Sequence, residues 1–135
     1  MAQDKVEFEL VSPERLLLSQ SVDMVVVPGE EGDFGVLVRH APLISAVRPG
    51  VIAVHEGGQV TERIFVAGGF AEVTPARCTV LAEQALPVGE IDRQAAEQQL
   101  KDAQEDLADA KNEQERTAAA RQVAVAEAMI QAAAP

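Results

Sequence analysis

The order of apolar and polar residues divides the chain into two regions with different periods. From Val6 to about Leu86, short apolar runs follow one another at roughly eight- to ten-residue spacing, and Val6, Phe8 and Leu10 alternate with glutamates. A period of two is typical of half-buried strands, and Gly and Pro turn signals separate the runs. This region therefore predicts an antiparallel β-sandwich, and its lack of helix-length segments excludes a doubly wound nucleotide fold.

After Leu86-Pro87-Val88-Gly89 the period becomes helical. Asp92 is a candidate N-cap, and Asn112 lies in a polar turn between two apolar stripes with four-three spacing. The stripes consist of Ala96, Leu100, Ala103, Leu107 and Ala110, and of Ala119, Val123, Ala126, Ile130 and Ala133. Two such stripes joined by a short turn predict an antiparallel helical hairpin. The predicted fold is α+β, with a β-sandwich domain at 1–87 and a helical hairpin domain at 88–135.

Alanine dominates both stripes, and each alanine buries little apolar area at about 25 cal/mol per Å². Helices of about 20 residues are marginal when alone in water. We therefore expect the sandwich to hold the hairpin weakly enough for the hairpin to leave it.

Charge and composition exclude several classes of partner. The formal net charge is −11 and the chain has neither Trp nor Tyr, which argues against nucleic acids and anionic membranes. The longest apolar runs, such as Met24–Val27, are far shorter than the roughly 20 residues of a membrane span. The acidic N-terminal region predicts no secretory signal. Cys78 is the only cysteine, so it forms no internal disulfide, and its strand pattern predicts a buried, inert thiol.

No catalytic constellation is visible, and we expect no cofactor, no metal and no enzyme activity. The sequence lacks a P-loop, Gly-x-Ser-x-Gly and His-Glu-x-x-His. His40 and His55 are too few for a histidine metal site, and Glu30, Glu31 and Asp33 lack calcium-loop spacing. The acidic tip at 30–33 is either a surface presented to another protein or a plain polar loop.

Two motifs carry a resemblance to a known family. Residues 32–50 read Gly-Asp-Phe-Gly-Val-Leu-Val-Arg-His-Ala-Pro-Leu-Ile-Ser-Ala-Val-Arg-Pro-Gly, and residues 66–73 read Val-Ala-Gly-Gly-Phe-Ala-Glu-Val. Pro42 fixes its own φ and favours an extended Ala41, so the first motif predicts two strands, 34–38 and 43–47, around a rigid corner. Together the motifs resemble the epsilon subunit of F-type ATP synthases, whose mitochondrial counterpart is called delta.

The resemblance implies a non-catalytic subunit of the central rotor stalk, which couples rotation of the c-ring to the gamma subunit. It places the loop at Glu31, Gly32 and Asp33 and the corner at His40, Ala41 and Pro42 towards the c-ring and the base of gamma. The C-terminal hairpin would reach the alpha and beta subunits of the catalytic head and regulate ATP hydrolysis. The location would be peripheral, on the cytoplasmic face of the bacterial inner membrane or the matrix face in an organelle, without direct membrane insertion.

Two departures from the family pattern concern the hairpin. Some relatives bind ATP through Ile-Asp-x-x-Arg-Ala, and here Ala95 stands where that arginine would be, although Asp92 matches. Arg93 lies about 200° around the helix from that position, so we expect no nucleotide binding. Inhibitory tails in the family are also rich in basic residues, whereas the last helix here has only Arg116 and Arg121. The expected inhibition is therefore weak.

The residues alone leave two other functions open. One is a free-standing sandwich that binds proteins and dimerises through its helical tail, which a tight homodimer in sedimentation would support. The other is a small enzyme that uses Asp or Glu side chains, which a deep acidic pocket would support.

Overall fold

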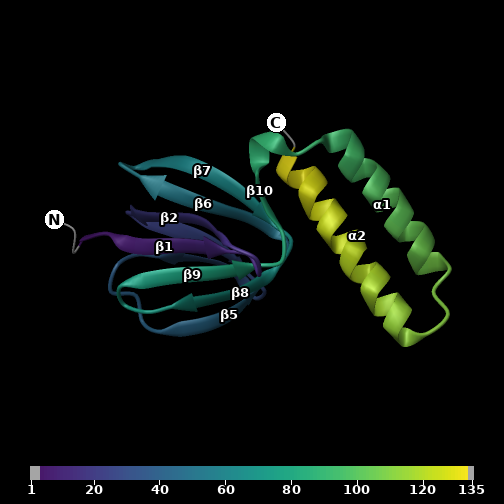
Figure 1. The fold of residues 1–135 in the computed structure, drawn as a ribbon, viewed down its shortest axis with the longest axis horizontal. Helices are drawn as coiled ribbons and strands as arrows, with labels where there is room; N and C mark the ends of the chain where they lie inside the picture. Colours follow the sequence, from purple (N-terminus) through teal and green to yellow (C-terminus); the bar gives the residue numbers. More distant parts are fainter. Residues whose placement is uncertain (1–3, 134–135) are drawn as a thin grey trace. The chain divides into compact units, whose positions relative to one another are not determined.

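The computed structural model describes residues 4–133 of the chain and shows two compact units, Met1–Pro87 and Val88–Pro135. The first unit contains all the described strands, and the second contains both α-helices (Figure 1). The α+β class predicted from the two periods is thus confirmed.

Ten strands follow one another in the described part of the first unit, where the recurring apolar runs predicted many short strands. Their bounds are β1 Val6–Val11, β2 Leu16–Val22, β3 Met24–Gly29, β4 Gly32–Val36, β5 Leu43–Val47, β6 Gly50–Glu56, β7 Gln59–Val66, β8 Gly69–Val73, β9 Arg77–Ala82 and β10 Ala85–Pro87. The strand predicted at 34–38 ends at Val36, because Arg39 takes a φ of 69° and donates its amide to the Pro75 carbonyl oxygen at 2.5 Å.

The strands hydrogen-bond in the order β10-β7-β6-β3-β5-β8-β9-β1-β2, with β4 beside β3. The link between β3 and β5 is a single pair, Gly29 with Val47, so the sheet bends there into the two layers of a sandwich. One layer holds β4, β3, β6, β7 and β10, and the other holds β5, β8, β9, β1 and β2. The pairing is antiparallel as predicted, except between β1 and β9, which run parallel.

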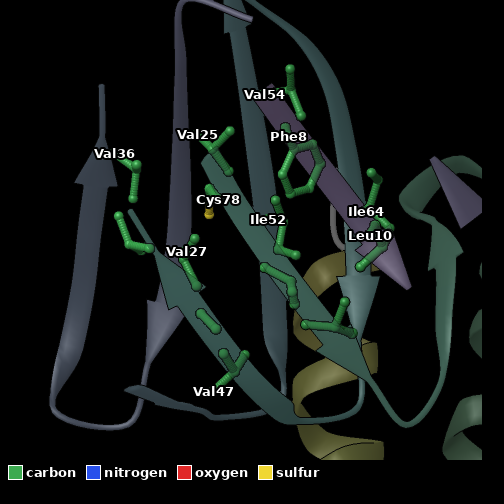
Figure 2. Packing of buried hydrophobic residues seen from close by; sticks show 14 of the residues in the cluster. Phe8, Leu10, Val25, Val27, Val36, Val47, Ile52, Val54, Ile64 and Cys78 are labelled. Atoms are coloured by element: carbon green, nitrogen blue, oxygen red, sulfur yellow. The ribbon is translucent and has the colours of Figure 1, made fainter. Parts of the chain in front are cut away.

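The core lies between the layers because each strand turns alternate side chains inward. Val6, Phe8 and Leu10 of β1 are buried, whereas Glu7 and Glu9 between them are not. Figure 2 shows Phe8 and Leu10 among residues of β3, β6 and β7, with the Cys78 sulfur in the same cluster.

Cys78 is fully buried and free, as its strand pattern predicted. Burial away from water raises the pKa of its thiol to about 12. A thiol of this kind packs as a small apolar side chain.

A tight reversal at Gly68-Gly69 joins β7 to β8 and requires glycine. Gly69 has a φ of +150°, and a Cβ there would lie 1.9 Å from the carbonyl oxygen of Leu81 on the neighbouring strand β9. No other residue avoids that clash without moving the backbone.

A polar cluster joins three segments where strands begin or end in the sandwich. Nζ of Lys5 lies 2.8 Å from Oε1 of Glu56 and 3.4 Å from Oδ1 of Asp23. The amide of Gly57 donates to Oδ2 of Asp23 at 2.7 Å, and this bond, with the Lys5 ammonium, lowers the pKa of Asp23. The bond to Glu56, with Asp23, raises the pKa of Lys5. The cluster links the start of β1 to the β2–β3 and β6–β7 connections.

The second unit is the predicted helical hairpin. After a short 3-10 turn, Val88–Glu90, helix α1 spans Arg93–Ala108 and helix α2 spans Glu113–Ala133. Asp92 caps α1 by accepting the Ala95 amide at 3.1 Å, and Asn112 accepts the Glu115 amide at 2.8 Å at the start of α2. The predicted cap and turn are therefore confirmed.

The buried residues of the hairpin are largely alanine, as the stripes predicted. The helices contact each other along their length, and two stripe residues of each helix are buried. These buried stripe residues are Ala96, Ala103, Ala119 and Ala126. Val125 and Met129 are also buried although they lie outside the predicted stripe of α2.

Candidate functional site

The acidic tip, residues 30–33, consists of the turn of the β3–β4 hairpin and the first two residues of β4. Gly29 and Gly32 pair across it, and Gly32 takes a φ of +137°. A Cβ on Gly29 would lie 2.7 Å from the Gly32 carbonyl oxygen, so glycine is needed for this close approach. Glu30 and Glu31 are thereby held as exposed side chains at the end of the sandwich.

Arg48 ties the acidic tip to the segment that follows β5. Its Nη2 lies 2.6 Å from Oδ1 of Asp33, and its Nη1 donates to the carbonyl oxygen of Gly29 at 2.5 Å. Its own amide donates to the carbonyl oxygen of Pro28 at 2.9 Å. Asp33 therefore already has a cationic partner within the protein.

A groove of about 600 Å³ runs between the acidic tip and β5. Backbone pairing forms it, since the Glu30 amide donates to the Ala46 carbonyl oxygen at 2.9 Å. Its lining, which we call the acidic groove, consists of Glu30, Glu31, Gly32, Asp33, Phe34, Leu43, Ile44, Ser45 and Ala46. One wall is acidic and the other carries apolar side chains, so the groove suits a cationic segment with an apolar side.

The structure brings Glu31, Gly32 and Asp33 into this groove, but His40, Ala41 and Pro42 do not line it. The last three lie in the β4–β5 loop, before the start of β5, whereas the tip meets the end of β5. The predicted interface residues therefore occupy two places joined by one strand.

The corner at His40 is a hydrogen-bonded loop. Nδ1 of His40 lies 2.7 Å from the Ala41 carbonyl oxygen, so Nδ1 holds the proton in this contact, and the His40 amide donates to the Leu37 carbonyl oxygen at 3.2 Å. Ala41 and Pro42 are exposed. The His40 ring is thus oriented by a backbone carbonyl within its own loop.

A row of apolar side chains crosses the outer face of the second layer. Strand register places one residue of each of five neighbouring strands directly opposite the next. The row, which we call the apolar stripe, consists of Ala46, Phe70, Leu81, Val11 and Leu16. Phe70 is 60 % exposed and Leu16 55 % exposed. Leu81 is also exposed, whereas Ala46 and Val11 are half-buried, so the stripe is a candidate contact surface for another protein.

Sequence reasoning missed the apolar stripe, although part of the signal was present. In Gly69-Phe70-Ala71-Glu72-Val73 the period of two puts Phe70 on the same face as Glu72, away from the buried Ala71 and Val73. An aromatic residue on the polar face of a strand was the local sequence signal for the apolar stripe. The alignment of the five strands, however, could not be read from the sequence.

The residues at the start of the hairpin that match the nucleotide motif are engaged in helix contacts. The carboxylate of Asp92 is used as the N-cap, and Arg93 pairs with Glu97, its Nε 3.3 Å from Oε2. Ala95 supplies only its amide to the cap. These contacts give the residues of the matched motif structural roles in the helix.

Within residues 4–133 no group of three or more His, Cys, Asp or Glu side chains is placed to hold a metal, and no charged side chain is buried. No helix within the same residues has the length and apolar character for a membrane crossing.

Comparison with protein families agrees with this division into two units. Residues 5–88 match the family model described as ATP synthase, Delta/Epsilon chain, beta-sandwich domain, and residues 92–134 match the model of the C-terminal domain of the ATP synthase epsilon chain. The chain belongs to the ATP synthase epsilon chain family. It is therefore a non-catalytic accessory subunit of that complex.

Curated epsilon chains resemble it over almost their whole length. The ATP synthase epsilon chain of Paramagnetospirillum magneticum is 58 % identical over 131 residues, which cover 97 % of this chain and 98 % of the relative. The epsilon chain of Rhodospirillum rubrum is 55 % identical, and the alignment covers 96 % of each protein. The resemblance inferred from the two sequence motifs is thus confirmed.

Solved structures show the same fold at lower identity. A subunit of the Euglena gracilis mitochondrial ATP synthase (OSCP/F1/c-ring) has a TM-score of 0.81 at 22 % identity, covering 96 % of this chain and 81 % of that one. A subunit of the Tetrahymena thermophila mitochondrial ATP synthase central stalk and c-ring has a TM-score of 0.75 at 15 % identity, covering 98 % of each. The sandwich with a helical pair is the fold of these subunits.

Proposed function

We propose that this epsilon chain is a rotor subunit that transmits rotation of the c-ring to the gamma subunit. The observation that carries the proposal is one continuous surface with two chemistries. Ala46 belongs to both the acidic groove and the apolar stripe, so the acidic tip and the stripe adjoin along β5. A subunit that binds two neighbours at once needs two contact surfaces in a fixed relative position, and a strand shared by both surfaces provides this.

The apolar stripe is the part that suits gamma. Permanent contacts between subunits are more apolar at their centre than the rest of a protein surface, and large aromatic residues dominate their energetics. Phe70 lies in the middle of the stripe, opposite Ala46 on one side and Leu81 on the other. The structural relative from Tetrahymena lies in a central-stalk and c-ring assembly, which supports a place in the rotor.

The acidic tip is the part that suits the c-ring. Glu30 and Glu31 are exposed at the end of the sandwich and face the groove, where they offer negative charge to basic side chains of a c-subunit loop. Charge of this kind contributes specificity and association rate more than affinity. The corner at His40, Ala41 and Pro42 is the further contact of this surface, towards the base of gamma.

A pull-down with purified gamma and with a gamma–c-ring complex tests the two assignments. The wild-type protein should bind both, and Glu30→Lys should weaken binding to the complex while leaving binding to gamma alone unchanged. Glu105→Lys makes the same change of charge at an exposed position of α1, outside both the groove and the apolar stripe, and serves as the control. Equal loss with both variants would show that only net charge matters. Failure of the wild-type protein to bind gamma would overturn the proposed function, and a tight homodimer in sedimentation would then favour the free-standing module.

The hairpin is the weak regulator of ATP hydrolysis in this proposal, through contacts with the alpha and beta subunits. Support comes from the charge of α2, where Arg116 is already paired with Glu113 at 3.0 Å and Arg121 is the only other basic residue of the helix. A helix with so little free positive charge binds an acidic surface weakly.

Removal of residues 88–135 from the complete synthase tests the regulation. We expect the ATPase rate to rise less than about threefold, which corresponds to a loss of less than about 0.7 kcal/mol of inhibition. A rise of tenfold or more would contradict weak regulation.

The location that goes with these partners is peripheral, on the cytoplasmic face of the bacterial inner membrane.

A further inference from the structure

Arg48 contacts the acidic tip and its flanking strand through both its side chain and its backbone amide. Its guanidinium holds Asp33 and the Gly29 carbonyl oxygen at the same time, and its amide holds the Pro28 carbonyl oxygen. These contacts fix both strands of the hairpin that carries Glu30 and Glu31. The Arg48 side chain is 42 % exposed and that of Asp33 59 % exposed, so the pair lies at the surface, within reach of a partner.

We propose that Arg48 is a positioning residue for partner recognition, which fixes the acidic tip in its binding shape and leaves Glu30 and Glu31 as the recognition charges. The proposal deepens the function proposed above and rests on it, because it names which carboxylates of the tip meet a cationic partner. Asp33 is assigned to the internal contact, since one of its oxygens is 2.6 Å from Nη2 of Arg48.

The forked guanidinium is the part of the side chain that matters. Two nitrogens of one planar group reach two acceptors in different strands, the Asp33 carboxylate and the Gly29 carbonyl. A lysine at this position would keep the charge but could not span both acceptors with the same geometry. Substitution by lysine therefore separates positioning from charge.

The direction of the change in affinity also distinguishes a positioning role of Arg48 from a role of its charge alone. Loss of a positive charge beside an acidic surface should strengthen attraction to a cationic partner if only Coulomb forces act. Loss of a positioning residue should weaken binding, because the flexible tip must then be ordered when the partner arrives. The two explanations predict opposite changes in affinity for the same variant.

The experiment compares Arg48→Gln, Arg48→Lys and Arg63→Gln in the full-length protein, with binding to the purified gamma–c-ring complex measured at two salt concentrations. Arg63 is an exposed residue of β7, which β6 separates from the strands of the tip, and it controls for net charge. We expect Arg48→Gln and Arg48→Lys each to weaken binding about fivefold and Arg63→Gln to leave it within about twofold. Unchanged or tighter binding by Arg48→Gln would overturn the proposal.

Hydrogen exchange in the isolated protein gives a readout that needs no partner. The Glu30 amide, which donates to the Ala46 carbonyl oxygen, should exchange about fivefold faster in Arg48→Gln and in Asp33→Asn, and at the wild-type rate in Arg63→Gln. Unchanged exchange in both tip variants would show that Arg48 does not hold the tip. If the wild-type protein failed to bind the complex while exchange changed as expected, the proposed function would fail and the structural role of Arg48 would stand.

Discussion

Phe70→Thr is the sharpest test of the apolar stripe, because it removes an exposed aromatic ring and keeps a residue that favours strands. A Phe side chain presents roughly 150–250 Å², and Phe70 is 60 % exposed, so a covering partner removes on the order of 100 Å² from water. At about 25 cal/mol per Å² this is worth about 2.5 kcal/mol, of which a threonine would retain a small part. We expect affinity for gamma to fall about 30-fold.

The stability of the isolated protein should change much less, since the ring is already in water. Only its cross-strand contacts with Ala46 and Leu81 are lost, which are worth about 0.2–1 kcal/mol per pair. Titration of purified gamma, followed by calorimetry, gives the affinity, and urea unfolding gives the stability. Val60→Thr is the matched control, because Val60 is an exposed apolar residue of β7 outside the stripe. Gamma binding within about threefold of wild type for Phe70→Thr would refute the assignment of the stripe.

Three further predictions concern the sandwich itself. Gly69→Ala should destabilise the protein by about 3 kcal/mol or more in urea unfolding, because its Cβ would meet the backbone of β9, whereas Gly89→Ala, with open space around it, should change stability by less than about 1 kcal/mol. Asp23 has a lowered pKa in the fold, so its contribution to stability is present above the unfolded pKa of about 4 and is lost as the pH falls through the lower folded value. Asp23→Asn should therefore reduce the loss of stability at acid pH in a plot of unfolding free energy against pH. An unchanged loss at acid pH would count against the role of the polar cluster. Cys78, with a pKa of about 12 and no exposure, should react with a thiol reagent at about pH 8 only on unfolding, and rapid reaction in native buffer would contradict its burial.

The overall fold followed from local patterns because each pattern reports burial directly. Alternation at Val6, Phe8 and Leu10 marks a strand with one buried face, and the alanine spacing after Asp92 marks a helix seam. The lone cysteine was placed correctly for the same reason. Periodicity could not show that β1 and β9 run parallel, since the direction of a neighbouring strand leaves no mark on either strand's own sequence.

The site was harder to predict because it depends on register and on contacts between distant residues. The acidic tip was visible as a polar turn, but its pairing with Arg48 joins residues 15 positions apart. The apolar stripe needs the alignment of five strands, and a shift of one residue in any of them would turn that member inward. The exposed Phe70 was the single local sign of it.

The parts of the family motif at residues 32–50 are connected to one another by contacts in the fold. The motif contains the end of the acidic tip, the corner at Pro42, all of β5 and Arg48, which returns to hold the tip. β5 links these parts, since Ala46 borders both the acidic groove and the apolar stripe and Val47 pairs with Gly29 where the sheet bends. A force applied to the tip would therefore pass through backbone hydrogen bonds of β5 into the layer that carries the stripe. Such a connection is what a subunit needs if it is to transmit torque between two neighbours.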